Sequence, residues 1–242
     1  MQNQPTLVQK LLAEALGTAL LTLIGAGSVT ATLTIAGGSG AKFSEADLGI
    51  ISFAFAFIIM AMIFAIGKVS GCHINPAVTA AFWSAGRISS SDAIRYVIAQ
   101  FIGAIVGAIL LIIIVKGKVG GYSVSGNGLG DTTWGPYGLW AAFVAEFLGT
   151  TIFTFVILAV SGEKGPGAIA GLITGLTLVM LHLAFIAVSG ASFNPARSFV
   201  PALFVGHKAL GQVWMYLIIP TLGGLFAGWL IKSKTLEERT TT

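Results

Sequence analysis

The chain is 242 residues long, and 55% of its side chains are hydrophobic while only 9% are charged. Because a soluble domain carries about 25% charged residues, this composition excludes a soluble globular enzyme, a disordered chain and a nucleic-acid-binding domain. The formal net charge of +4 is a small excess on an almost uncharged chain and does not indicate a nucleic-acid partner. The single cysteine excludes a disulfide framework within the chain and a cysteine-based zinc site.

Long apolar stretches predict membrane spans along most of the chain. A helix needs about 20 mostly apolar residues to cross the hydrocarbon core. Six stretches qualify, at about residues 11–35, 48–66, 93–115, 139–160, 168–188 and 213–231. Two shorter apolar segments, 76–84 and 195–205, begin with proline and are too short to cross; such segments are tolerated at membrane depth only when buried in protein or lining a cavity. We therefore expect an all-α membrane protein with six transmembrane helices and two re-entrant half-helices.

Basic residues near the span ends predict the orientation, because cytoplasmic ends carry an excess of Lys and Arg. With the N-terminus inside, the cytoplasmic set is the larger one and both termini are cytoplasmic. The inner set is Lys10, Lys68, Arg87, Arg95, Lys164, Lys232, Lys234 and Arg239, and the outer set is Lys42, Lys116, Lys118, Arg197 and Lys208. The expected location is the plasma membrane or a bacterial or archaeal inner membrane.

Two motifs occur twice and define an internal repeat. The segment 13–18, AEALGT, matches 145–150, AEFLGT, and 70–77, SGCHINPA, matches 189–196, SGASFNPA. Each half, about 11–115 and 139–231, contains three predicted spans, and an odd number gives the halves opposite orientations. The sequence therefore predicts one domain, 1–242, built as an inverted 3+3 repeat with its functional site near the membrane midplane, where the discontinuous helices meet.

The two Asn-Pro-Ala motifs have a direct physical interpretation. Proline suits the first helical position, so Asn75 and Asn194 occupy the N-caps of the half-helices. Two half-helices of nine residues placed end to end span about 27 Å, close to the hydrocarbon thickness of about 30 Å. The asparagines would thus meet at mid-membrane, where each amide can cap its helix and still offer an uncharged donor to a passing molecule. The alternative is that both residues only cap helices.

The chain resembles the aquaporin (major intrinsic protein) family over about residues 11–231. The resemblance rests on the two motifs Asn75-Pro76-Ala77 and Asn194-Pro195-Ala196, and on the Ala-Glu-x-x-Gly-Thr motif at the start of each half. It resembles the water-selective members more than the aquaglyceroporins. The resemblance implies a passive channel that conducts water and excludes ions and protons. It also implies a homotetramer in membrane lipid, with no enzymatic activity, cofactor or metal. The alternatives are a channel for glycerol, hydrogen peroxide, urea or ammonia, and a proton-coupled secondary carrier.

Arg197 is the predicted charged member of a selectivity filter. A charged residue at membrane depth is costly and marks a functional site, and the first half has Val78 at the equivalent position. The resemblance implies that Phe55, His182 and Ala191 complete the constriction. His182 would narrow the pore in a way that suits water, although a histidine satisfied within the core is the alternative. The small Ala191 would widen the filter somewhat.

The resemblance also implies roles for residues near the two turns. The predicted pore lining is Gly71, Cys72, His73, Gly190, Ser192, Ile59 and Leu178. Cys72 either lines the pore or is an inert buried thiol. Glu14 and Glu146 are expected to be structural supports that accept hydrogen bonds from the loop before each half-helix. A proton-coupled carrier, which also uses inverted repeats and buried carboxylates, is the competing explanation for these two acids.

Overall fold

The computed structural model describes residues 4–37, 43–163 and 165–235. Within these ranges the protein is all-helical, and six helical segments are long and apolar enough to cross a membrane. The first span, Leu7–Ala36, comprises α1 (Leu7–Leu21), a π-helical turn (Thr22–Ala26) and α2 (Gly27–Ala36). The others are α3 (Glu45–Ser70), α5 (Ser90–Lys116), α7 (Gly138–Val160), α8 (Ala170–Ser189) and α10 (His207–Lys232). A 3-10 turn (Gly167–Ile169) precedes α8. The half-helices are α4 (Pro76–Ser84) and α9 (Pro195–Val205), as predicted, and a short α6 (Val124–Asn127) lies between α5 and α7.

Several spans begin earlier than hydropathy predicts, because polar caps extend them beyond the apolar stretch. Thr6 accepts a hydrogen bond from the backbone of Gln9 and starts α1, and Ser44 and Ser89 cap α3 and α5 in the same way. The π-helical turn inside the first span is a further difference, and hydropathy carries no signal for it. Lys42, Lys164 and Arg239, which contributed to the predicted orientation, lie outside the described residues.

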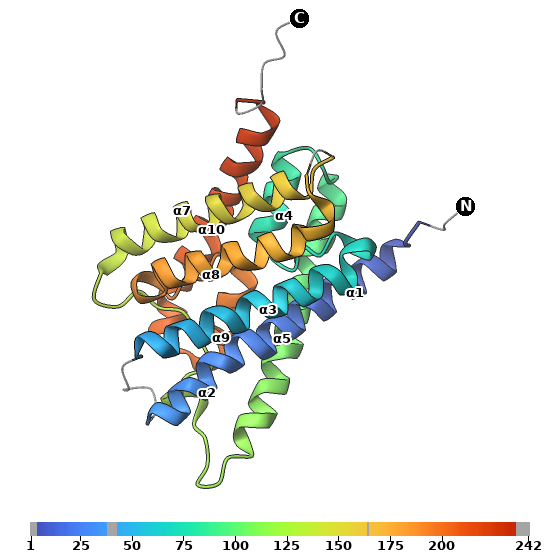
Figure 1. Cartoon of the computed structure of the whole chain (residues 1–242). Coiled ribbons are helices and arrows are strands. Elements are labelled where there is room, and N and C mark those ends of the chain that lie inside the picture. The colour runs from blue at the N-terminus through green and yellow to red at the C-terminus, as the bar shows by residue number, and fades with distance from the viewer. Residues whose placement is uncertain (1–3, 38–42, 164, 236–242) are drawn as a thin grey trace, which may run out of the picture.

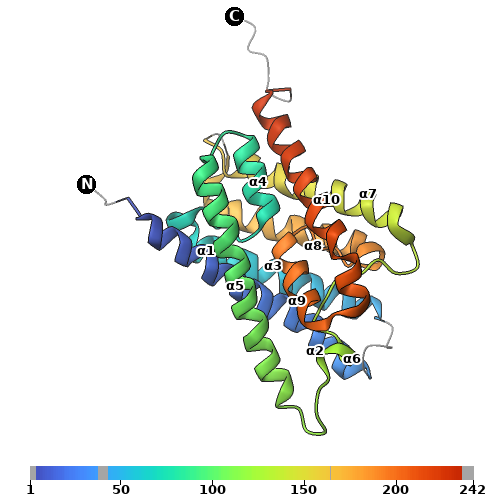
Figure 2. The same ribbon diagram turned by 180° about the vertical axis from the view of Figure 1, so that it is seen from behind.

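The helices pack in a pattern that repeats between the two halves. Helix α1 packs against α3 and α5, α7 packs equivalently against α8 and α10, and α3 and α8 pack against each other across the halves. Both half-helices contact α5 and α10, and the back view shows α4 and α9 between these two helices (Figures 1 and 2). The half-helices are therefore held within the bundle, which is where short helices can exist in a membrane.

Three glycine pairs with four-residue spacing allow helices to approach closely. A Cβ at Gly107 would lie 2.2 Å from the carbonyl oxygen of Ala19 in α1, and one at Gly228 would lie 2.3 Å from that of Ala81 in α4. The pairs are Gly103 and Gly107, Gly171 and Gly175, and Gly224 and Gly228. Such small-residue contacts are the usual means of packing helices in a membrane, and here one of them fixes a half-helix against α10.

Candidate functional site

The two half-helices meet at their asparagine caps. The Oδ1 atom of Asn75 and that of Asn194 each accept a backbone N–H from the first turn of their own helix. The Nδ2 atom of Asn75 donates to the carbonyl of Phe193 at 2.7 Å, and that of Asn194 donates to the carbonyl of Ile74 at 3.1 Å. Each amide has two N–H donors and uses one to join the halves. The second donor of each amide can then face a molecule in the pore.

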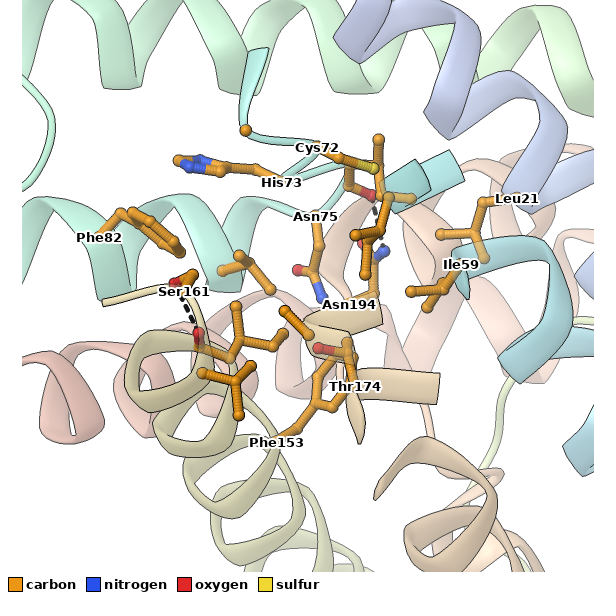
Figure 3. A pocket seen from close by; sticks show the side chains of 17 residues that line it. Leu21, Ile59, Cys72, His73, Asn75, Phe82, Phe153, Ser161, Thr174 and Asn194 are labelled. Carbon is orange, nitrogen blue, oxygen red and sulfur yellow. Dashed lines mark hydrogen bonds between the residues drawn. The ribbon is translucent and has the colours of Figure 1, made fainter. Parts of the chain in front are cut away.

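A cavity of about 60 Å³ extends from the two asparagines toward the side of the bundle where α1 begins and α10 ends. Figure 3 shows Asn75 and Asn194 next to each other, with Phe82 and Ser161 farther away among the lining residues. Its volume exceeds the roughly 10–15 Å³ that one water needs. Of the residues predicted to line a pore, it is lined by Ile59, Gly71, Cys72, His73, Asn75 and Asn194.

The remaining predicted lining residues are not part of this cavity. Leu178 is buried in the same apolar cluster as Ile59. Gly190 faces a loop residue, since a Cβ on it would lie 3.1 Å from the Thr132 side chain. The Ser192 hydroxyl donates to the carbonyl of Asn194 at 3.0 Å. A pore-lining role for Gly190, Ser192 and Leu178 therefore stays a prediction for the opposite half of the channel.

The backbone before each half-helix is left-handed at residues that are not glycine. The φ angles are 53° at Cys72 and 43° at Ile74, and the equivalent Ala191 and Phe193 have φ angles of 45° and 50°. Such a conformation is uncommon for non-glycine residues and an outlier for a β-branched one, so it persists only where surrounding contacts hold it. The sequence shows no sign of this strain, because it depends on partners from other helices.

Glu14 and Glu146 supply these partners. Glu14, fully buried in α1, accepts the Ser70 hydroxyl at 2.7 Å and the backbone N–H groups of His73 and Ile74 at 2.9 and 2.6 Å. The equivalent donors to the fully buried Glu146 are the Ser189 hydroxyl at 2.7 Å, Ser192 N at 2.8 Å and Phe193 N at 2.9 Å. A backbone N–H that is buried needs an acceptor, and each carboxylate satisfies two of them in the turn before a half-helix. This geometry suits the structural support predicted for both acids.

Gln100 belongs to the same cluster, and sequence reasoning missed it. Its Nε2 atom donates to Glu14 Oε2 at 2.8 Å and to Thr79 Oγ1 at 2.9 Å, so it joins the carboxylate to half-helix α4. A buried amide in the middle of an apolar span was the available signal. Two tyrosines were missed as well: the Tyr96 hydroxyl donates to the carbonyl of Ser70, and the Tyr216 hydroxyl donates to that of Ser189.

On the other side of the asparagines, the structure brings together three of the four predicted filter side chains. The rings of Phe55 and His182 are stacked, with centroids 5.1 Å apart and planes at 19°. Arg197 Cζ lies 4.8 Å from the Phe55 ring centroid, within cation–π range. Ala191 is fully buried and belongs to the same apolar cluster as Phe55.

Two buried polar atoms in this group have no hydrogen-bond partner among the described residues: His182 Nε2 and Arg197 Nε. His182 Nδ1 lies 3.0 Å from the carbonyl oxygen of Leu178. Because a carbonyl can only accept, Nδ1 donates, and Nε2 of the neutral ring is then an acceptor. The group therefore presents one acceptor and one donor. Buried polar atoms are usually satisfied, so a small polar molecule that reaches these two atoms would supply the partners they lack.

Comparison with known proteins agrees with this geometry. The family model for "Major intrinsic protein" matches residues 1–231. The chain belongs to the major intrinsic protein family. Among its relatives, the protein called Aquaporin Z from Rhodopseudomonas palustris is 43% identical over 224 residues, covering 90% of each chain. Aquaporin Z from Bradyrhizobium diazoefficiens is 40% identical, covering 94% of this chain and 95% of the relative.

A solved structure in the family has the same fold. The aquaglyceroporin from Plasmodium falciparum matches with a TM-score of 0.80 at 25% sequence identity, covering 94% of this chain and 96% of that one. Six spans with two half-helices are thus the family architecture, and this family comprises transporters rather than enzymes. Both the relatives named Aquaporin Z and an aquaglyceroporin match this chain, so the choice of solute rests on the site.

Proposed function

We propose that the chain is a passive transmembrane channel that conducts water and excludes ions and protons. The observation that carries this proposal is that His182 Nε2, an acceptor, and Arg197 Nε, a donor, are both buried without a partner in the described part of the chain, on side chains that contact the Phe55 ring. A water molecule can donate to the first and accept from the second. The buried guanidinium opposes cations, and the positive ends of both half-helix dipoles meet at the asparagines and do the same. The relatives named Aquaporin Z support this assignment.

The solute range follows from the same side chains. The stacked rings of Phe55 and His182 occupy space that a larger polyol would need, which favours water over glycerol and urea. Ala191 adds no bulk to the constriction, and this favours hydrogen peroxide as an additional solute because its size and hydrogen-bonding groups are close to those of water. A proton-coupled carrier is disfavoured because Glu14 and Glu146 each accept hydrogen bonds from backbone N–H groups in the turn before a half-helix.

Stopped-flow light scattering on proteoliposomes tests the proposal. We expect water permeability well above that of empty liposomes, independent of a proton gradient, with glycerol and urea permeability at the level of the lipid. Hydrogen peroxide is measured in parallel with an enclosed peroxide-sensitive dye. Glycerol permeability equal to that of a known glycerol facilitator would contradict the water-selective filter, and saturable transport that depends on a proton gradient would favour the carrier.

Cys72 provides a separate test of the cavity. It is the single cysteine of the chain, and it lines the cavity together with both asparagines (Figure 3). We expect a mercurial reagent to block water permeability by occupying this narrow space, and a thiol reductant to restore it. The variant Cys72→Ser should conduct water and be insensitive to the reagent. Full mercury sensitivity in Cys72→Ser would show that block does not occur at this cavity.

We further propose a multi-pass inner-membrane protein that forms a homotetramer in the lipid, with both termini in the cytoplasm. The cavity would then lie on the cytoplasmic side and the Phe55, His182 and Arg197 group on the outer side. Large apolar side chains are exposed on the helices, including Ile98, Ile113 and Trp140. Such surfaces require lipid or another apolar partner. Because the described residues contain six candidate spans, an even number, both termini would lie on one side, and the basic residues favour the cytoplasm.

A further inference from the structure

Residues 129–132, called the buried strap below, lie in the segment between α5 and α7 and are packed into the bundle. Leu129 is fully buried and Thr132 is 2% exposed. Gly130 has a φ angle of 66°, and a Cβ on it would lie 2.4 Å from the carbonyl oxygen of Ala26. Leu129 packs in a cluster with Ala196 of α9. The buried strap is therefore confined between the first span and the half-helix that carries Arg197.

The buried strap holds the filter arginine directly. The carbonyl oxygen of Gly130 accepts a hydrogen bond from Arg197 Nη1 at 2.6 Å. Among the described residues, the guanidinium makes this one hydrogen bond, and its Nε atom has no partner. The position of the charged group in the filter thus depends on where the Gly130 carbonyl lies.

A chain of hydroxyl groups connects the buried strap to α9. Thr132 Oγ1 lies 2.6 Å from Ser198 Oγ, the Ser198 hydroxyl contacts that of Ser192, and Ser192 Oγ donates to the carbonyl of Asn194. A hydroxyl has one proton to donate. Because Ser192 donates to Asn194, Ser198 must donate to Ser192, and Thr132 must donate to Ser198. The chain is complete only if residue 132 carries a hydroxyl.

The residue equivalent to Ser198 in the first half has a different hydrogen-bond donor, and this comparison draws attention to Thr132. Thr79 occupies the place of Ser198, four residues after the asparagine, and contacts His73 as Ser198 contacts Ser192. Its hydroxyl also accepts a hydrogen bond from Gln100 on span α5, in the place that Thr132 takes in the second half. In the second half that donor comes from a loop, and the same loop supplies the acceptor for Arg197. Besides Thr132, Asp131 also uses its side chain in the strap: its Oδ1 atom accepts a hydrogen bond from Leu129 N, which does not connect the strap to a helix.

We propose that Thr132 is a positioning residue of the selectivity filter: by donating to Ser198 it fixes the buried strap, so that the Gly130 carbonyl holds the Arg197 guanidinium against the pore. This inference rests on the proposed channel function. Thr132 touches no solute, and it acts through the strap on the width of the constriction. Loss of its hydroxyl releases the guanidinium and admits molecules larger than water.

The test compares Thr132→Val, which keeps the shape and removes the hydroxyl, with Thr132→Ser, which keeps the hydroxyl. Both proteins are reconstituted in liposomes, and water and urea permeability are measured together with thermal stability. A neutral hydrogen bond of ordinary strength corresponds to a factor of about five in rate, so we expect the urea-to-water permeability ratio to rise about fivefold in Thr132→Val. Thr132→Ser should keep the wild-type ratio.

Ser198→Ala removes the same hydrogen bond from the side of α9, and it decides the result if Thr132→Val folds poorly. We expect Ser198→Ala to raise the ratio as Thr132→Val does, and the double variant to add nothing further. An unchanged ratio in these variants, or a parallel fall of water and urea permeability with stability, would overturn the positioning role. Failure of the wild-type protein to conduct water would overturn the channel function as well.

Discussion

The variant Arg197→Val is expected to admit protons and small cations while water still passes. Valine occupies the equivalent place in the first half, at Val78, so the half-helix backbone tolerates it. Arg197 is 3% exposed, and its guanidinium lies beside Phe55. A cation passing at about 4 Å is repelled by about 4 kcal/mol at an effective dielectric constant near 20. Each 1.36 kcal/mol changes a rate tenfold, so removal of a barrier of about 4 kcal/mol should raise proton flux by up to about a thousandfold.

Proton flux is measured with a pH-sensitive dye enclosed in the liposomes, alongside water permeability of the same preparation. Arg197→Lys is the matched control, because it keeps the charge and replaces the planar donor set that reaches the Gly130 carbonyl. We expect Arg197→Lys to exclude protons and cations nearly as well as the wild-type protein. Proton flux that is equally low in Arg197→Val would show that the dipoles of the two half-helices suffice for exclusion and that the arginine charge has another purpose.

The variant Glu146→Leu is expected to lose stability and water permeability together. It leaves the N–H groups of Ser192 and Phe193 buried without an acceptor, at a cost of about 1–3 kcal/mol each. Phe193 has a left-handed backbone, which relaxes once its N–H group is released. Because the Phe193 carbonyl accepts from Asn75, the change should reach the meeting point of the half-helices. The readouts are the apparent melting temperature in detergent and the water permeability of proteoliposomes.

Two control variants distinguish a structural role of Glu146 from a role in proton-dependent transport. Glu163→Leu makes the same substitution at an exposed position and should leave both readouts near the wild-type values. Glu146→Gln retains one acceptor oxygen and should be intermediate in stability. If Glu146→Leu matched the wild-type protein in stability and permeability, the carboxylate would not be a structural support. Loss of a proton-dependent transport with unchanged stability would instead favour the carrier.

Span positions and half-helix starts could be predicted because their causes are local. An apolar stretch of sufficient length forms a helix in a membrane whatever lies beside it, and Asn followed by Pro caps a helix through its own next residues. The predicted starts at Pro76 and Pro195 agree with the structure for this reason. The predicted starts of the spans are less accurate, since hydropathy does not register N-terminal polar caps such as Thr6 and Ser44.

The candidate site was only partly predictable, because its polar partners are distant in sequence. Glu14 was recognisable as an acid in an apolar span, but its donor Gln100 is 86 residues away, and nothing near Gln100 indicates the pairing. Thr132 lies in a loop that no periodicity describes, and its partner Ser198 is 66 residues away. Repetition of a motif identifies equivalent positions, whereas a hydrogen bond between helices depends on how those helices pack.

By itself, the sequence determined the membrane environment, the number of spans, the two half-helices and the inverted repeat, because hydropathy, capping and repetition act over a few residues at a time. The tertiary structure alone decided that Ile74 and Phe193 have left-handed backbone whose N–H groups donate to buried carboxylates, and that a loop carbonyl accepts a hydrogen bond from Arg197. These features require acceptors and donors from different helices to meet. Their geometry is set when the bundle packs, and no single stretch of the chain contains it.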